Sequence, residues 1–167
     1  QSGVPALYYG NESGCGMSVI GMTITDKTEV FAETNVKDGT AVLIGFNSDA
    51  SKKDRGFLVK DGGRLIARAK GGIAIDADDI TIDNGYVYAK GGRAGLYGGT
   101  IIVENNGVVE SEARDYAIHS GRMSVLSGAE VTAKADFYGT YIHNGDIIVS
   151  VGELTGILTG KYEDANS

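Results

Sequence analysis

The chain has little of several residue types, and each scarcity narrows what the protein can be. Its 167 residues include one proline, one cysteine and no tryptophan. A single cysteine cannot form an internal disulfide, so Cys15 is expected to be a small core residue. The sequence also has no run of 18 apolar residues. We therefore expect no membrane insertion.

Basic residues are also in the minority. The chain has 15 Lys and Arg against 22 Asp and Glu, a net charge of −7, and its basic residues are scattered along the sequence. Sequence-independent binding to a phosphate backbone needs a basic face that displaces counterions. We therefore expect no nucleic-acid partner.

What the sequence does contain is a repeat. Six segments share an apolar pair two residues apart, a short polar turn, and a second pair made of Val or Leu and a small residue. The starts of the segments are 35, 23, 21, 22 and 24 residues apart. A period near 22 residues is typical of a solenoid. The copies are Met22, Ile24, Val30, Ala32; Phe57, Val59, Leu65, Ala67; Ile80, Ile82, Val87, Ala89; Ile101, Val103, Val109, Ser111; Met123, Val125, Val131, Ala133; and Ile147, Val149, Leu154, Gly156.

A third apolar position lies five residues before the start of a coil. This spacing predicts three short strands per coil, each with one side chain turned inward between outward neighbours. No segment shows the apolar period of a helix, and the 26 glycines suit frequent tight turns. Left-handed β-helices return about every 18 residues. The longer coil of about 22 residues, with sides of unequal length, favours a right-handed, three-sheet type. We predict an all-β fold, a right-handed single-stranded parallel β-helix of about seven coils. The third positions are Met17, Ile75, Leu96, Ile118 and Ile142.

The whole chain, residues 1–167, reads as one domain. Residues 1–21 fit a partial leading coil, 47–55 a polar loop excursion, and 161–167 a polar tail. Neither end shows an amphipathic cap. An uncapped β-helix exposes strand edges, which would allow end-to-end or homo-oligomeric contact.

Stacked coils turn outward positions into columns, and one column gathers both histidines. It contains Tyr97, His119 and His143, and Tyr141 lies in the column beside it, among the small residues Ala74, Gly95 and Ala117. Tyrosine offers an apolar ring with a polar tip, which suits stacking on a sugar. Two alternatives stay open. The column can be an ordinary ladder of exposed side chains, or its two histidines can hold a transition metal, although a structural zinc site needs four ligands.

Two further features are candidates for binding. Tyr86 and Tyr88, with Phe31 and Ile66, form an apolar patch on the second strand, which marks a contact surface unless the 47–55 excursion covers it. An acidic run, DADDITID, is either a solvated turn or a source of oxygen ligands for calcium. Its carboxylates are Asp76, Asp78, Asp79 and Asp83.

Three stretches carry a family resemblance: GGIAIDADDITIDNGYVYAKGG, GGTIIVENNGVVES and SGAEVTAKA. They resemble the repeats of bacterial cell-surface right-handed β-helix proteins, including the calcium-dependent carbohydrate-binding family first described in cellulolytic clostridia. The resemblance covers most of residues 57–156. It implies a secreted or cell-surface location, calcium held by the acidic turn at Asp76, Asp78 and Asp79, and an acidic or neutral polysaccharide as the partner.

The same scaffold carries polysaccharide lyases and hydrolases, and fold alone does not decide function. A polygalacturonase-like Gly-His-Gly turn is absent, and the only proline, Pro5, leaves no Arg-x-Pro motif of the pectate-lyase type. Arg68, Lys90 and Lys134 do share an outward column with Glu112. The predicted function is a non-catalytic carbohydrate-binding or adhesive surface module. The alternatives are a structural stalk or assembly unit and a divergent polysaccharide lyase or hydrolase.

Overall fold

The structure is a computed structural model that describes residues 14–45 and 56–159. Within these ranges it contains fifteen strands and no helix, and all of the strand pairings are parallel. No described segment is therefore a helix long and apolar enough to cross a membrane. The strands are β1 (Met17–Val19), β2 (Met22–Ile24), β3 (Glu29–Thr34), β4 (Thr40–Ile44), β5 (Gly56–Lys60), β6 (Arg64–Ala69), β7 (Ile73–Asp83), β8 (Tyr86–Gly91), β9 (Ala94–Glu104), β10 (Val108–Ala113), β11 (Tyr116–Leu126), β12 (Glu130–Ala135), β13 (Tyr138–Ile142), β14 (Ile147–Ser150) and β15 (Glu153–Leu158).

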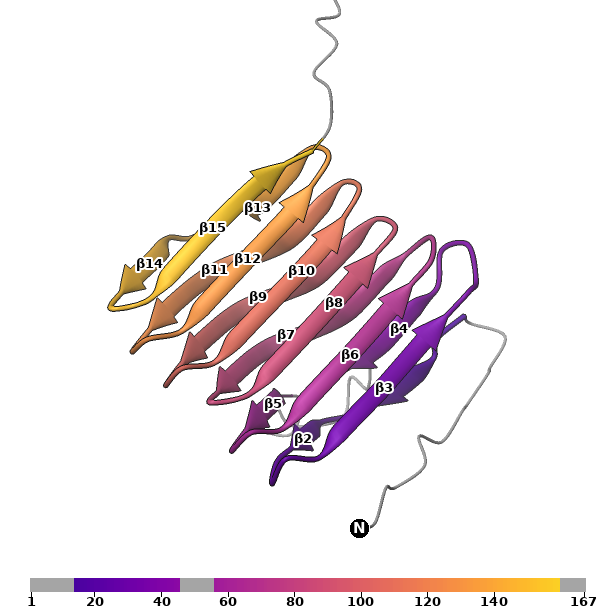
Figure 1. Cartoon of the computed structure of the whole chain (residues 1–167). Helices are drawn as coiled ribbons and strands as arrows, with labels where there is room; N and C mark the ends of the chain where they lie inside the picture. The colour runs from indigo at the N-terminus through magenta and orange to yellow at the C-terminus, as the bar shows by residue number, and fades with distance from the viewer. Residues whose placement is uncertain (1–13, 46–55, 160–167) are drawn as a thin grey trace, which may run out of the picture.

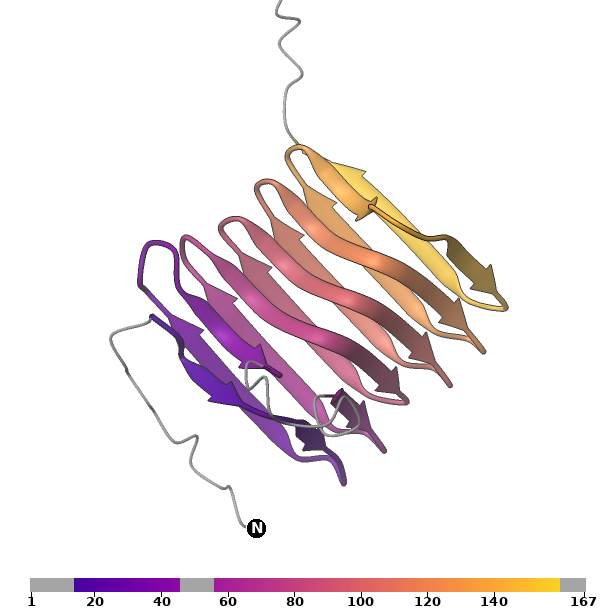
Figure 2. The same ribbon diagram turned by 180° about the vertical axis from the view of Figure 1, so that it is seen from behind.

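The strands form two sheets that face each other. One sheet has six strands in the order β15-β12-β10-β8-β6-β3, and its strands run straight across the front of Figure 1. The other has nine strands, with β1-β4-β7-β9-β11-β13 as its main path and β2, β5 and β14 beside it. Figure 2 shows that its long strands are curved. We call them the straight sheet and the curved sheet.

The predicted fold class is confirmed. The chain winds as a β-solenoid of about six turns with a period near 22 residues. The direction of the front strands and the advance from β3 to β15 make the winding right-handed (Figure 1). The number of turns is lower than the predicted seven. One reason is that the segment before β5 uses extra residues without adding a turn. Val42 and Phe57 are 15 residues apart, whereas their partners Ile75 and Ile80 are five apart. The predicted 47–55 excursion lies in this interval, outside the described residues, as does the 161–167 tail.

The prediction of three separate strands per coil was wrong. The third segment of one coil and the first segment of the next form a single strand of 11 residues in β7, β9 and β11. In each of these strands alternation breaks where two outward residues follow one another, as at Asp78 and Asp79, which are both exposed. The strand bends there, and pairing to the next coil continues on both sides of the bend. The cross-section therefore has two sheets instead of three.

The core fills the space between the two sheets. The curved sheet contributes large aliphatic side chains such as Ile75, Leu96 and Ile118, all fully buried. The straight sheet contributes both larger side chains such as Leu65 and small ones such as Ala133, also fully buried, and the small ones let the two layers approach closely. Each buried large aliphatic side chain contributes about 1.5–3 kcal/mol to folding.

Two of the turns that lead into the straight sheet consist of Asn followed by Gly, at Asn84-Gly85 and Asn106-Gly107. Asn84 has a positive φ of 53°, a conformation that Asn tolerates better than most residues. At Gly85, a Cβ atom would come within 2.7 Å of the Val59 carbonyl oxygen. Only glycine therefore lets this turn stack closely on the preceding coil.

Candidate ligand-binding site

An aromatic ladder lies on the outer face of the curved sheet. Tyr97 on β9, His119 on β11 and Tyr141 on β13 are register partners on three successive strands. The ring centroid of His119 lies 4.6 Å from that of Tyr97 and 5.1 Å from that of Tyr141, both edge to face. The column of Tyr97 and His119 predicted from the repeat is confirmed by this pairing.

Two tyrosines that sequence reasoning missed complete the site. Tyr116 and Tyr138 are register partners, and their rings stack with centroids 5.2 Å apart and planes 10° apart. Tyr116 also lies 5.1 Å from His119 and 5.5 Å from Tyr141. A signal was available, because the two tyrosines are one period apart in the sequence. We call the full set of six rings the aromatic cluster: Tyr97, Tyr116, His119, Tyr138, Tyr141 and His143.

The predicted places of Tyr141 and His143 were wrong. Tyr141, not His143, pairs with His119, and Ile142 pairs with Ser120. The cause is a longer connection, since Tyr138 lies nine residues before Ile147 whereas its partner Tyr116 lies seven before Met123. His143 still reaches the site, because its ring centroid is 5.1 Å from that of His119.

The small residues expected to leave room beside the rings are elsewhere. Ala74 and Ala117 are fully buried, and so face the core instead of a ligand. At Gly95 the space of a side chain is taken by the Ser111 hydroxyl, which donates a hydrogen bond of 2.6 Å to the Ala117 carbonyl oxygen. The aromatic cluster is therefore an open surface and has no pocket formed by these residues.

Exposure and charge suit the aromatic cluster to an uncharged ligand. Tyr138 is 49% exposed and Tyr141 is 39% exposed, while Tyr97, Tyr116 and His119 are half-buried. Burial lowers the pKa of His119 below 6.5, and the nearby His143 and Arg93 lower it further. His119 is therefore neutral at pH 7, where its ring can both donate and accept hydrogen bonds.

The four acidic residues do not form the predicted turn. All four lie in strand β7 of the curved sheet, and Asp83 is seven positions beyond Asp76. Burial raises the pKa of Asp76, as does the charge of Asp78, and Arg93 opposes both. Asp83 instead accepts a 2.8 Å hydrogen bond from the Asn105 side chain. Residues 14–45 and 56–159 contain no group of three or more His, Cys, Asp or Glu side chains that could hold a metal ion, so calcium stays a prediction.

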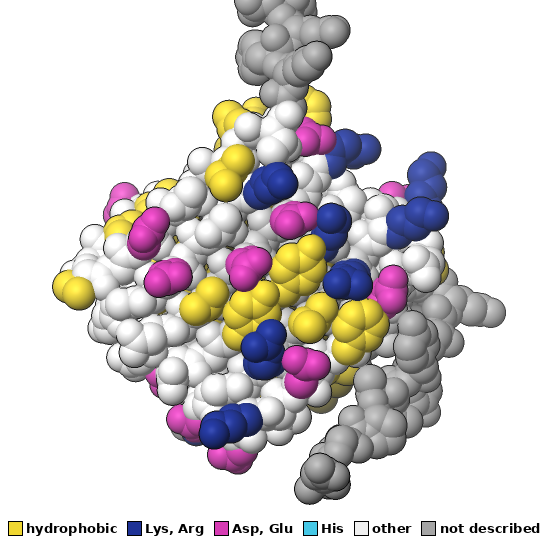
Figure 3. Space-filling view, viewed as in Figure 1, with side chains coloured by type: hydrophobic (Ala, Val, Ile, Leu, Met, Phe, Trp, Pro, Cys, Tyr) yellow, Lys and Arg dark blue, Asp and Glu magenta, His cyan; other side chains and the backbone are white. Residues whose placement is uncertain are grey.

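Tyr86 and Tyr88 lie on the straight sheet, and the register of their columns is as predicted. Figure 3 shows an apolar patch on this face with charged side chains around it. The Arg64 guanidinium lies 4.4 Å from the Tyr86 ring centroid, and the Tyr86 hydroxyl donates a 3.2 Å hydrogen bond to Glu110. Arg68 lies 5.8 Å from the Tyr88 ring centroid. Cation–π contacts therefore cover part of this patch.

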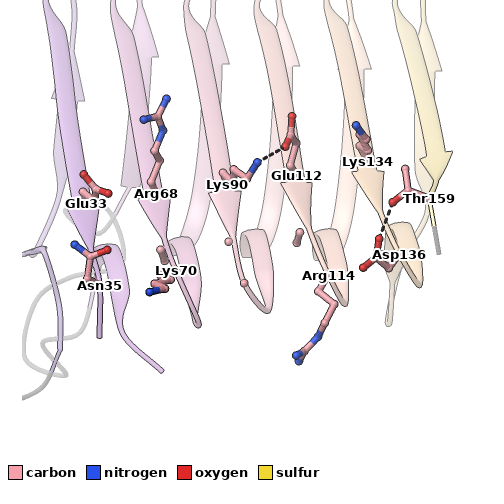
Figure 4. Close-up of a pocket in the computed structure, with 14 residues that line it drawn as sticks. Glu33, Asn35, Arg68, Lys70, Lys90, Glu112, Arg114, Lys134, Asp136 and Thr159 are labelled. Carbon is pink, nitrogen blue, oxygen red and sulfur yellow. Dashed lines mark hydrogen bonds and ion pairs between the residues drawn. The ribbon is translucent and has the colours of Figure 1, made fainter. Parts of the chain in front are cut away.

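A groove of about 540 Å³ crosses the same sheet at the carboxyl ends of its strands (Figure 4). The column of Arg68, Lys90, Glu112 and Lys134 lines it, as the repeat predicts. Lys90 donates a 2.9 Å hydrogen bond to Glu112, and this bond and the carboxylate charge raise the pKa of Lys90. Lys90 is therefore a cation at neutral pH and is poorly suited to abstract a proton.

Comparison of the chain with family models, with curated proteins and with solved structures found no match. The resemblance to carbohydrate-binding β-helix proteins therefore stays a prediction from the repeats.

Proposed function

We propose that this protein is a non-catalytic carbohydrate-binding or adhesive module that holds a glycan on the aromatic cluster. The supporting observation is the contiguity of six rings, whose neighbouring centroids are 4.6–5.6 Å apart. Tyrosine rings offer an apolar face to a sugar and a hydroxyl at the rim for hydrogen bonding. A secreted or cell-surface location and a bacterial source belong to the same proposal, and the repeats support them.

The sheet gives these rings a rigid support. The rings project from β9, β11 and β13 and from the residue after β13, and the three strands are joined by continuous parallel pairing. Side chains held on strands lose little freedom when a ligand binds, which favours affinity. An open row of rings along the solenoid axis also suits an extended chain of sugars better than a single small molecule.

Binding is favoured over catalysis by the surroundings of the histidines. A nucleophilic site needs a base hydrogen-bonded to both a nucleophile and an orienting group. Within the described ranges, neither His119 nor His143 forms a side-chain hydrogen bond or an ion pair. Their ring contacts are with other rings of the cluster. A divergent lyase or hydrolase is therefore the weaker proposal.

The test is a glycan-array screen of the purified chain, with calcium and again with EDTA. We expect binding to a defined neutral polysaccharide. Loss of that binding in EDTA would support the calcium part of the proposal and direct mutagenesis to Asp76, Asp78 and Asp79. If no glycan on the array binds with calcium or with EDTA, the proposal is overturned.

Titration calorimetry with the best glycan then locates the site. Tyr141→Ala and Tyr138→Ala should each weaken binding about tenfold, the upper range for one aromatic contact. Tyr88→Ala is the matched control, because it removes a tyrosine from the straight sheet. An unchanged affinity in both cluster variants with a loss in Tyr88→Ala would move the site to the straight sheet and refute the cluster.

A structural assembly unit is the second candidate function, and the last coil supports it. Its strands expose apolar side chains such as Ile148 (50%) and Leu158 (65%). Of the described strands, β12 alone pairs with β15, which leaves the other edge of β15 able to accept a strand. Sedimentation velocity at rising concentration tests this candidate. Growth into larger species supports it, and a single monomeric species at all concentrations rejects it.

A further inference from the structure

The groove on the straight sheet is shaped by small residues between long ones. Ala69, Gly91, Gly92 and Ala113 line it beside charged side chains from the neighbouring positions. At Gly92 a Cβ atom would overlap the Lys70 carbonyl oxygen, so no other residue fits the backbone there. The close backbone approach at Gly92 therefore keeps this part of the hollow, of about 540 Å³ in all, free of a side chain.

The groove carries more positive than negative charge, although the chain as a whole has a net charge of −7. Five basic and three acidic side chains line it. Two basic side chains are paired, Lys90 with Glu112 at 2.9 Å and Arg114 with the neighbouring Asp115 at 2.7 Å. The other three make no ion pair with any described residue: Arg68, Lys70 and Lys134.

The unpaired cations are spread along the groove. Arg68 on β6 and Lys134 on β12 are three strand spacings apart through β8 and β10, a distance of about 14 Å at roughly 4.8 Å per strand. A small anion cannot reach both positions, but an oligomer can. Arg68 also lies 5.7 Å from the Phe31 ring centroid, which helps to hold its planar guanidinium at the edge of the groove.

Acidic groups between these cations limit the ligand further. Glu33, Glu112 and Asp136 line the same groove, and Asn35 and Thr159 add uncharged polar groups. A ligand with widely spaced anionic groups and hydroxyls between them would place the anions on the cations and donate hydrogen bonds to the carboxylates. Duplex DNA carries one charge per about 1.7 Å of its axis, so it would bring phosphates against these carboxylates.

We propose that this groove binds an acidic polysaccharide, one that carries carboxylate or sulfate groups along an extended chain. The site lies on the straight sheet, whereas the aromatic cluster lies on the curved sheet, so the proposal does not rest on the proposed function. Recognition here is electrostatic and needs no metal ion.

The experiment measures binding of four probes in EDTA: polygalacturonate, dextran sulfate, neutral dextran and a single-stranded DNA oligomer. The groove variant is Arg68→Gln/Lys70→Gln/Lys134→Gln. The control Lys27→Gln/Lys60→Gln/Arg122→Gln removes the same charge from residues that do not line the groove. We expect the wild type to bind an acidic polymer with an affinity that falls as salt rises, about tenfold weaker binding in the groove variant, and a change of about threefold or less in the control.

Each other result overturns the proposal. Equal losses in the two variants would mean that overall charge, not the groove, attracts the polymer. If the DNA oligomer binds more tightly than the acidic polysaccharides, the groove is a nucleic-acid site. If neither polygalacturonate nor dextran sulfate binds, the groove is not a binding site for acidic polysaccharides. Lys134→Gln alone, checked for an unchanged unfolding midpoint, guards against a folding defect in the triple variant. Tyr138→Ala/Tyr141→Ala should keep acidic-polymer binding, and its loss there with retention in the groove variant would refute the groove while leaving the aromatic cluster intact.

Discussion

The central coils and the last coil follow the same template with different results. In the central coils, β9 and β11 run unbroken for 11 residues, and their inward residues Ile101 and Met123 are fully buried. In the last coil, β13 ends at Ile142 and β14 begins at Ile147. Ile147 occupies the position equivalent to Met123 but is 44% exposed.

The difference produces the candidate site. Two extra residues in the last connection place Tyr141 beside His119 and bring the His143 ring within 5.1 Å of it. The same shift makes Thr140 the register partner of Ile118, so Thr140 takes the inward position on β13. A strict repeat would have kept Ile142 inward. The regular coils thus supply the support for the rings, and the departure from the repeat brings the rings together.

The largest expected effect is the loss of stability when a side chain is truncated in a central coil, compared with the same truncation in the last coil. Ile118→Ala in a central coil should lower the free energy of unfolding by about 2–5 kcal/mol, because it leaves a cavity in a closely packed core. Ile147→Ala in the last coil removes the same side chain from an inward position that is 44% exposed, and it should cost less, about 1 kcal/mol. Urea unfolding followed by circular dichroism measures both. Similar costs would show that the last coil is as tightly packed as the centre.

Much of the fold could be predicted because the repeat fixes register by simple alternation. The columns of the straight sheet, such as Arg64, Tyr86 and Val108, follow directly from equal coil lengths. Strand β4 was missed although Val42 and Ile44 show the same alternation, because Val42 lies 15 residues before Phe57 instead of the usual five. The bend in β7, β9 and β11 has no apolar signal, since it consists of two outward residues.

The candidate site could be predicted only in part for a similar reason. Tyr97 and His119 belong to central coils, where counting from Leu96 and Ile118 gives the correct column. In the last coil, both Thr140 and Ile142 are available for the inward position, and apolarity favours Ile142. The structure places Thr140 there, while Tyr138 stacks on Tyr116. Local hydrophobicity cannot report a contact between rings one coil apart.

A second, smaller effect tests that register. The Thr140 hydroxyl oxygen is buried and has no hydrogen-bond partner among the described residues. Thr140→Val keeps the shape, removes the unpaired polar atom and should raise the free energy of unfolding by about 1 kcal/mol. Thr132→Val, at an outward position of the straight sheet, is the control and should change little. A destabilised Thr140→Val protein would mean that the Thr140 hydroxyl has a hydrogen-bond partner and does not lie unpaired in the inward column.

The smallest expected effect is a shift in the pKa of His119, a central-coil residue whose ring contacts His143 in the last coil. Its pKa lies below 6.5, first because of burial and then because of His143 and Arg93. The folded state therefore binds this proton less readily than the unfolded state, so the stabilisation is complete above pH 6.5 and is lost as pH falls through the lowered pKa. Titration by NMR should show His119 protonating below pH 6.5, and His143→Gln should move the His119 pKa upward because it removes one repulsive neighbour from the last coil. Since burial is the larger cause, the pKa should stay below 6.5 in that variant. A His119 that titrates at or above 6.5 in the wild type would mean that the cluster is more open to water than the packing of its rings indicates.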